Sequence, residues 1–146
     1  MNFGVDIPFV HHLGFTLERF DGGHSTIAFT PQPEHMNSFG VTHGGACMTL
    51  LDVAMAVAAR SVVPESGIVT IEMKTSFMRP ACGALLAHGL LKHRTATMAF
   101  VEATIVDADG QACAHATGTF KYVKRLPTGA RSVNPFNVTS GVISTD

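Results

Sequence analysis

The sequence predicts an α+β fold in which a curved antiparallel sheet wraps around one long helix. Three observations lead to this prediction: a hairpin pattern near the start, a single apolar helix pattern early in the chain, and a succession of long strand patterns after it. The length of 146 residues is close to the commonest size of one compact domain. We therefore expect one domain over 1–126 and a C-terminal appendage over 127–146.

The first predicted element is a hairpin over 13–30, where apolar and polar residues alternate on both sides of Asp21-Gly22-Gly23. A period of two is typical of strands with one buried face, and an Asp-Gly pair favours a tight hairpin turn. Pro31-Gln32-Pro33 then ends the second strand, because proline cannot donate a hydrogen bond to its neighbour strand.

The next predicted element is a helix from Gly45 to about Arg60, which follows a loop rich in Gly, Asn and Ser. It contains one carboxylate, Asp52, among residues that are otherwise apolar or nearly so. A helix that is apolar on every side is expected to be buried, and a buried carboxylate without partners is destabilising unless it takes up a proton. Asp52 is therefore the most informative residue of the chain.

After the helix, the sequence predicts four strands in succession. Their residues are 68–78, 84–94, 98–107 and 111–124. Turns rich in Pro, Gly, Asp and Thr separate them. We expect the four strands to form a meander that follows the single helix and wraps around it.

The composition disfavours nucleic acid and membranes as partners. The formal net charge is −1 and the Lys and Arg residues are scattered, so no basic footprint for either partner exists. Only 14% of residues are charged and the mean hydropathy is +0.25, which indicates more apolar surface than a monomer of this size can hide. We therefore expect a homo-oligomer.

The cysteines and the N-terminal residues predict a cytoplasmic protein. Cys47, Cys82 and Cys113 are odd in number and show no CxxC spacing, which fits reduced thiols. The first residues form neither a basic segment nor a cleavable apolar one, and the predicted helix is too short to span a bilayer. Neither a metal nor another cofactor is expected, because the eight histidines show no ligand spacing.

The start of the helix carries a second chemical signal, His43-Gly44-Gly45. First-turn N–H groups have no partner within a helix and lie at the positive end of its dipole, which suits a carbonyl that becomes an oxyanion. Asp52 lies nine positions after His43, about two and a half turns further along. One helix therefore cannot bring both groups to one substrate, and an antiparallel helix of a second copy must supply the other half.

These residues resemble a known family. Asn37, His43-Gly44-Gly45 and Asp52, with the strand 69–80 behind them, resemble the hotdog-fold acyl-CoA thioesterases of the PaaI-like and 4-hydroxybenzoyl-CoA type. The resemblance covers roughly 13–123 in matching element order. It implies a hotdog fold, hydrolysis of an aryl or medium-chain acyl-CoA to free acid and CoA, and a homodimer with shared active sites. The dimers of such proteins join their sheets edge to edge and usually pair into a homotetramer.

The resemblance also assigns roles at the helix. The Gly44 N–H would polarise the thioester carbonyl, Gly45 would lie beside it in the substrate site, and His43 would shape the helix start. Asp52 of the other subunit would activate water or attack the carbonyl directly. Both roles need the same residue in the same place, so the sequence leaves them open.

Four further residues take roles from the resemblance. Asn37 would orient the thioester or the water, and Thr70 would place a hydroxyl beside Asp52. Lys92 and Arg94 would lie near the coenzyme A phosphates.

Purely structural interpretations of these residues stay open. Asp52 could cap a loop or pair with Arg60, and His43 could be only a local hydrogen-bonding residue. Asn37 could be a turn former and Thr70 an ordinary strand residue.

Two functions remain in competition. A thioester carbonyl is already electrophilic, so a carboxylate with one or two oriented N–H donors can hydrolyse it without a metal. The alternative is a non-catalytic module that binds or senses acyl-CoA. A pure binding site has no need to bury a carboxylate, so the sequence favours hydrolysis.

Overall fold

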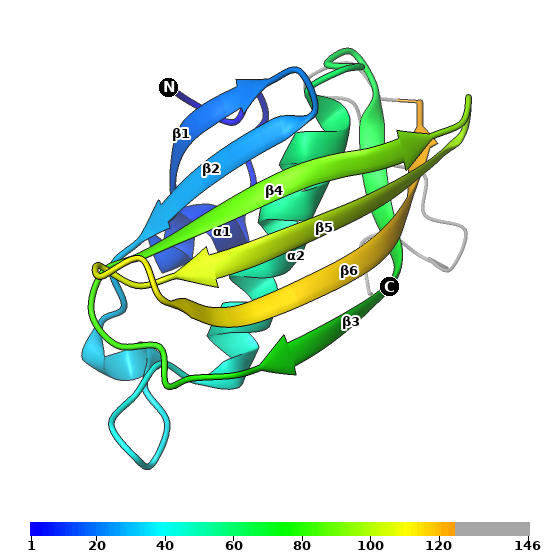
Figure 1. The fold of residues 1–146 in the computed structure, drawn as a ribbon. Helices are drawn as coiled ribbons and strands as arrows, with labels where there is room; N and C mark the ends of the chain where they lie inside the picture. The colour runs from blue at the N-terminus through cyan, green and yellow to red at the C-terminus, as the bar shows by residue number, and fades with distance from the viewer. Residues whose placement is uncertain (125–146) are drawn as a thin grey trace, which may run out of the picture.

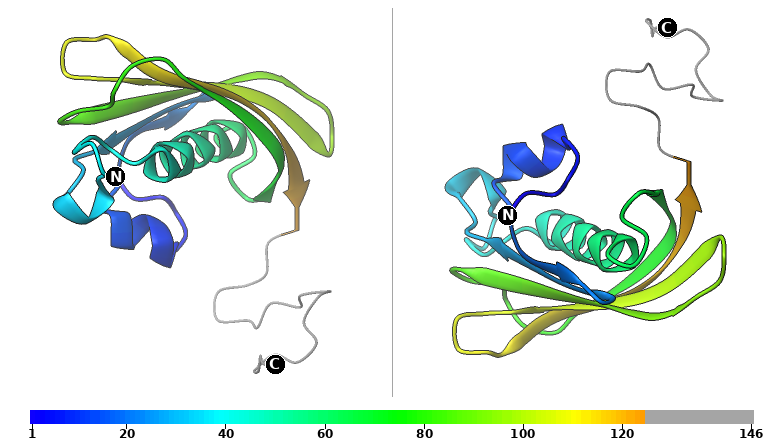
Figure 2. Two further views of the ribbon diagram at one scale, coloured as in Figure 1. Left: turned by 90° about the horizontal axis from the view of Figure 1, so that it is seen from below. Right: turned by 90° about the horizontal axis from the view of Figure 1, so that it is seen from above.

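A six-stranded antiparallel sheet curves around one long helix in the computed structural model, which describes residues 1–124 (Figure 1). The elements are α1 (Pro8–Leu13), β1 (Thr16–Asp21), β2 (His24–Phe29), a 3-10 turn η1 (Pro33–His35), α2 (Gly44–Arg60), β3 (Gly67–Phe77), β4 (Leu85–Arg94), β5 (Met98–Val106) and β6 (Ala112–Val123). The strand order is β1-β2-β4-β5-β6-β3, and Figure 2 shows α2 in the concave side of the sheet. The predicted fold class is confirmed. The predicted appendage, 127–146, lies outside the described residues.

The prediction of a simple meander was wrong for β3. Strands β4, β5 and β6 follow one another through tight turns, but β3 pairs with β6 and lies at the edge of the sheet. The reason is the connection 78–84, which is too long for a hairpin and passes the N-terminal end of α2. There the carbonyl of Ala81 accepts a hydrogen bond of 3.0 Å from the N–H of Thr42.

The prediction of a single helix was also incomplete. The short helix α1 begins at Pro8 and ends before Gly14, which adopts the left-handed conformation with φ 77°. Proline at the first position and glycine after the last are helix boundary signals. They were overlooked because six residues are too few to show a helical period.

The buried face of α2 approaches the sheet very closely. Five helix residues on this face are fully buried: Leu50, Leu51, Ala54, Met55 and Ala58. At the point of closest approach the Ser25 hydroxyl donates a hydrogen bond of 2.6 Å to the carbonyl of Ala54. Gly89 of β4 makes this contact possible, because a Cβ atom there would lie 2.4 Å from the same carbonyl oxygen.

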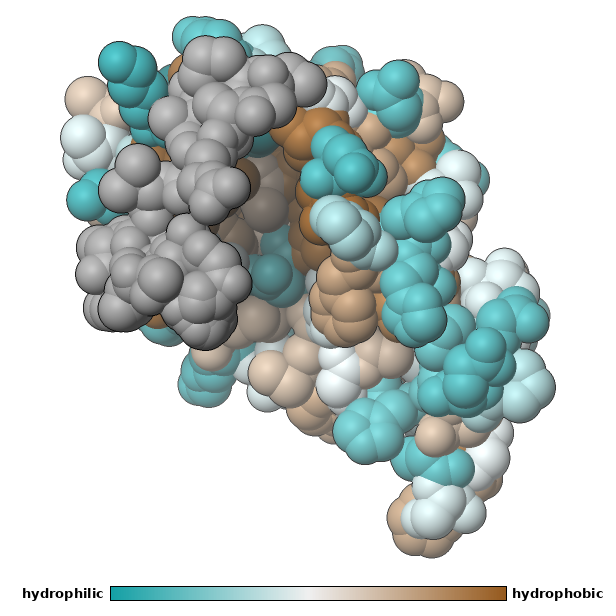
Figure 3. Space-filling model, turned by 180° about the vertical axis from the view of Figure 1, so that it is seen from behind, coloured by the Kyte–Doolittle hydropathy of each residue, from teal (hydrophilic) through white to brown (hydrophobic). Residues whose placement is uncertain are grey.

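The opposite face of α2 is only partly covered in the single chain, which corrects the expectation of a helix buried on every side. Met48 is 39% exposed, and Asp52, Val53 and Ala56 are half-buried. Residues near the N-terminus pack against this face without closing it. Figure 3, a view from behind the sheet, shows hydrophobic residues beside a hollow on this side of the molecule.

Substitution of Gly89 by alanine tests the close approach of helix and sheet. We expect Gly89→Ala to lower the free energy of unfolding by about 3 kcal/mol or to prevent folding, because the backbone carbonyl of Ala54 cannot move aside. Gly118→Ala is the matched control with an expected loss of about 1 kcal/mol, because the atoms nearest to its Cβ belong to the side chains of Phe120 and Met55 and not to the backbone. Urea unfolding measures both, and equal losses would contradict the proposed packing.

Candidate active site

The helix start is organised by the His43 side chain. His43 is the N-cap residue of α2, and its Nδ1 accepts a hydrogen bond of 2.8 Å from the N–H of Gly45. A Cβ at Gly45 would lie 3.1 Å from this nitrogen, so glycine makes room for the ring. Within the described part of the chain, the N–H of Gly44 has no hydrogen-bond partner. The Gly44 N–H is therefore the donor available to a ligand.

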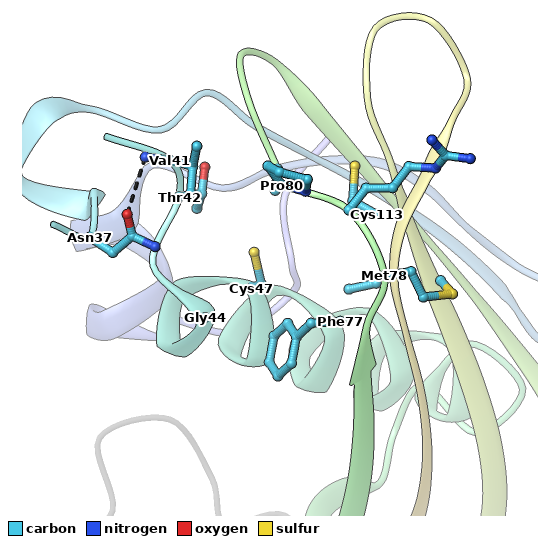
Figure 4. Close-up of a pocket in the computed structure, with 12 residues that line it drawn as sticks. Asn37, Val41, Thr42, Gly44, Cys47, Phe77, Met78, Pro80 and Cys113 are labelled. Carbon is cyan, nitrogen blue, oxygen red and sulfur yellow. Dashed lines mark hydrogen bonds between the residues drawn. The ribbon is translucent and has the colours of Figure 1, made fainter. Parts of the chain in front are cut away.

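Gly44 lines a cleft of about 380 Å³, here called the Gly44 cleft (Figure 4). The loop before α2, the first turn of α2 and the segment after β3 form its walls. The ring of Phe77 forms a wall next to Gly44, where a Cβ would lie 3.4 Å from two ring carbons. Phe77 and the exposed Arg79 are lining residues that the sequence analysis did not single out.

Asn37 also lines the Gly44 cleft. Its Oδ1 accepts hydrogen bonds from the N–H groups of Phe39 (2.8 Å) and Val41 (3.2 Å), so it does form a turn. The side-chain Nδ2 has no partner among residues 1–124 and keeps its two donors. The turn-forming and ligand-orienting interpretations of Asn37 are thus compatible.

Asp52 and Thr70 meet between α2 and β3. The Thr70 hydroxyl donates a hydrogen bond of 2.7 Å to Oδ1 of Asp52. Burial raises the pKa of the Asp52 carboxyl above its usual value, and the smaller effect of the Thr70 hydrogen bond lowers it. The second oxygen of the carboxylate has no hydrogen-bond partner in residues 1–124.

The suggested pair of Asp52 with Arg60 is not formed in the described structure. Instead, Arg60 donates a hydrogen bond of 2.9 Å to the carbonyl of Phe3, and its guanidinium lies 5.2 Å from the ring centre of Phe20. Among residues 1–124, Asp52 therefore has a hydroxyl beside it and no opposite charge that would hold its pKa down.

Asp52 and Thr70 line two adjoining hollows on the face of α2 away from the sheet. One, here called the Asp52 cleft, has a volume of about 390 Å³ and mostly apolar walls. The other, of about 430 Å³, lies toward Met48 and Phe9. Gly44 lines neither of them. The two groups of one helix therefore face different clefts, in agreement with their spacing in the sequence.

Lys92 and Arg94 are not brought to these clefts in the single chain. Lys92 Nζ lies 3.4 Å from a carboxylate oxygen of Glu102 on the neighbouring strand. The Arg94 guanidinium lies 4.8 Å from the ring centre of Tyr122, whose hydroxyl donates to the carbonyl of Ala59 near the end of α2. This is the opposite end of the helix from Gly44.

Cys47 and Cys113 both line the Gly44 cleft, and burial raises the pKa of both thiols, which disfavours the nucleophilic thiolate form. Burial, with a smaller contribution from nearby Cys113, raises the pKa of the Cys47 thiol to about 11, so it stays protonated. Among residues 1–124, no three His, Cys, Asp or Glu side chains are grouped as metal ligands. None of the helices described has the length and apolar character needed to cross a membrane.

The sequence is similar to thioesterase and esterase sequences. Residues 39–114 match the family model of the thioesterase superfamily. A candidate esterase of Saccharolobus solfataricus is 30% identical over 110 residues, which cover 75% of this chain and 78% of that protein. A candidate esterase of Halobacterium salinarum is 29% identical over 122 residues, with 75% of this chain and 80% of that protein covered.

Solved structures show the same fold. A conserved protein from Pseudomonas aeruginosa superposes with a TM-score of 0.78 at 24% identity, covering 82% of this chain and 97% of that one. The Escherichia coli PaaI protein from the phenylacetic acid degradation operon gives a TM-score of 0.76 at 22% identity, with 81% and 86% covered. The hotdog fold expected from the resemblance is confirmed.

The raised pKa of Asp52 predicts a stability gain in Asp52→Asn. The folded state binds the Asp52 proton more tightly than the unfolded state, so stability falls as the pH rises through the window between the two pKa values. Asparagine carries no charge, so we expect a higher Tm than wild type at neutral pH and a difference that shrinks as the pH is lowered. Calorimetry at several pH values measures this. The exposed Asp6→Asn is the control, and an equal gain there would contradict the explanation.

Proposed function

This chain belongs to the thioesterase superfamily, and from that premise we propose that it hydrolyses acyl-CoA thioesters to the free acid and CoA. One observation carries the proposal. The helix α2 begins with the Gly44 N–H, which no residue of 1–124 engages, and it also holds Asp52 in a largely apolar cleft, with the Thr70 hydroxyl hydrogen-bonded to one of its oxygens. The proposed hydrolysis needs two groups: a donor for the developing oxyanion and a carboxylate of raised pKa.

In the proposed reaction, the Gly44 N–H donates a hydrogen bond to the thioester carbonyl oxygen, which gains negative charge as the carbonyl carbon is attacked. The free oxygen of Asp52 takes a proton from the attacking water, or itself attacks and forms a mixed anhydride that water then cleaves. The C–S bond breaks and the CoA thiolate leaves and is protonated. Thr70 holds the other oxygen of Asp52 and so fixes the direction of the carboxylate.

The proposal requires two copies of the chain, because Gly44 and Asp52 of one copy open into different clefts. The free edge of β3 supports such a dimer. It carries exposed Val69 (44%) and Ile71 (54%), and an unpaired strand edge favours pairing with another strand. Edge-to-edge pairing of two β3 strands would bring together the half-covered faces of the two α2 helices. A homotetramer built from two such dimers completes the proposed assembly.

Polar residues around the Gly44 cleft suit the rest of the substrate. Asn37 keeps two amide donors with which to orient the thioester or the water. Arg79 is better placed than Lys92 or Arg94 to meet an anionic group of a molecule bound there, since it lines the cleft and is exposed. For Lys92 and Arg94, only their positive charge supports a proposed contact with the coenzyme A phosphates.

We further propose that the reaction takes place in the cytoplasm. The support is that all three cysteines are free, including the exposed Cys82. Free thiols persist in reducing compartments.

Asp52→Asn tests the catalytic carboxylate. We expect its kcat for acyl-CoA hydrolysis to fall by about 10²- to 10⁴-fold, because asparagine neither accepts a proton nor attacks the carbonyl. In wild type, kcat/KM should fall as the pH is lowered through the raised pKa of Asp52, since only the carboxylate form acts. Release of free thiol measures both. Full activity of a folded Asp52→Asn protein would refute the proposal, and binding of acyl-CoA by wild type without any turnover would favour a sensing module.

Gly44→Pro tests the oxyanion donor, because proline removes the N–H and little else. Proline is well tolerated at the first position of a helix, and His43 before it already has a compatible backbone with φ −60° and ψ 139°. We expect kcat to fall by about 10²- to 10³-fold. Gly44→Ala, which keeps the N–H and adds a similar contact with Phe77, should lose far less.

Mixed dimers of Gly44→Pro and Asp52→Asn chains test the shared site. One of the two sites in such a dimer combines the intact Asp52 of one chain with the intact Gly44 of the other. We expect co-expressed and doubly tagged mixed dimers to recover up to about half of wild-type activity, although each variant alone is nearly inactive. Mixed dimers as inactive as the parents would show that the site is not shared in this way.

A further inference from the structure

The Asp52 cleft extends along α2 well beyond the carboxylate. Asp52, Ala56 and Arg60 are spaced four residues apart, so they share one face of the helix, and all three line the cleft. At 1.5 Å per residue, the cleft follows the helix axis for about 12 Å from Asp52 to Arg60. Hydrolysis of the thioester needs only the Asp52 end, so the remaining length points to another purpose.

The walls of this extension are apolar and come from three parts of the chain. Val53 and Ala56 belong to α2, Ile68 belongs to β3, and Val5 and Ile7 come from the segment before α1. The narrow side chain of Ala56 keeps the middle of the cleft open. Binding to such a surface is favourable only when an apolar group removes it from water.

At its far end the cleft is lined by a charged side chain that is held in place. Arg60 is only 7% exposed, and its side chain is fixed by the Phe3 carbonyl and the Phe20 ring. Val5 lies near this end, because a Cβ at the adjacent Gly4 would lie 2.8 Å from the Arg60 guanidinium. The held guanidinium cannot move aside for a further methylene group, and a charged group offers it no apolar contact. Arg60 therefore limits the length of any apolar group in the cleft.

We propose that the Asp52 cleft is the acyl site and that it selects straight, medium-chain acyl groups of about eight to ten carbons. This inference rests on the proposed thioesterase function. An extended chain advances about 1.2 Å per bond, by analogy with the extended peptide backbone, so about 12 Å holds a chain of this length. With the thioester carbon at Asp52, the chain runs between Ala56 and Ile7 and ends before Arg60.

Two alternatives are less favourable: an aryl group in the Asp52 cleft, and an acyl chain in the other hollow beside Asp52. A benzoyl or phenylacetyl group is shorter and leaves the Arg60 end without an apolar partner. The hollow on the other side of Asp52 lies toward Met48, on the surface that the second copy covers in the proposed dimer. The Asp52 cleft instead has apolar walls from α2, β3 and the N-terminal segment of the same chain.

The test is a chain-length profile of wild type and two variants. kcat/KM is measured for straight acyl-CoAs from acetyl to tetradecanoyl and for benzoyl- and phenylacetyl-CoA. In wild type, we expect a rise of up to about fourfold per added methylene group, a maximum at octanoyl or decanoyl, and a fall beyond it. Ala56→Phe fills the middle of the cleft and should move the maximum to butanoyl or hexanoyl.

Val5→Trp is the second variant, because Val5 is 37% exposed on the N-terminal segment and its replacement leaves the core intact. It narrows the Arg60 end and should also shorten the preferred chain. Val62→Phe is the control, since Val62 is exposed and lines none of the clefts around Asp52 or Gly44. Its profile should match that of wild type.

The results separate the acyl site from the proposed function. Three outcomes would overturn the acyl site while leaving hydrolysis in place. They are a flat chain-length profile, a preference for the aryl-CoAs, and an unshifted maximum in a folded Ala56→Phe or Val5→Trp protein. If no acyl-CoA is hydrolysed, the proposed function fails. Calorimetry with non-hydrolysable S-alkyl-CoA thioethers then still tests the cleft, through a chain-length dependence of Kd that the two variants shorten.

Discussion

The close contact between α2 and the sheet is the constraint on which the rest of the structure depends. The Ser25 hydroxyl and the bare backbone of Gly89 hold the carbonyl of Ala54 against β2 and β4. Residues two positions apart on a helix point in nearly opposite directions. With Ala54 fixed toward the sheet, Asp52 must point away from it, toward β3 and the N-terminal segment. The packing of the core thus decides where the carboxylate lies.

The face of α2 that carries Asp52 holds the candidate catalytic carboxylate and is only partly buried in the single chain. The carboxylate is removed from water far enough to raise its pKa, and Thr70 satisfies one of its oxygens. The same face leaves Met48 and neighbouring apolar groups partly exposed, beside the free edge of β3. A second copy of the chain would cover this surface and bring a Gly44 N–H to each Asp52. In the proposed enzyme, assembly and catalysis therefore depend on the same surface.

The sequence predicted the local elements well and their arrangement less well. The helix and the strands after it were found to within one residue, because their periods and the Gly and Pro turns extend over many residues. The short helix at Pro8 was missed, and β3 was placed beside β4. Strand order depends on contacts between distant segments, and no local pattern records the route of 78–84 past the start of α2.

The sequence alone determined the chemical groups of the candidate site: a lone carboxylate in an apolar helix, and a His-Gly-Gly start too far from it to share a substrate within one chain. Both follow from residue type and the helical rise, which act locally. The family resemblance pointed to a Thr70 hydroxyl beside Asp52, but only the tertiary structure decided that the two form a hydrogen bond of 2.7 Å and that Ile7 and Ala56 face one cleft. These contacts join segments far apart in the chain, so only the packing of the whole fold brings them together.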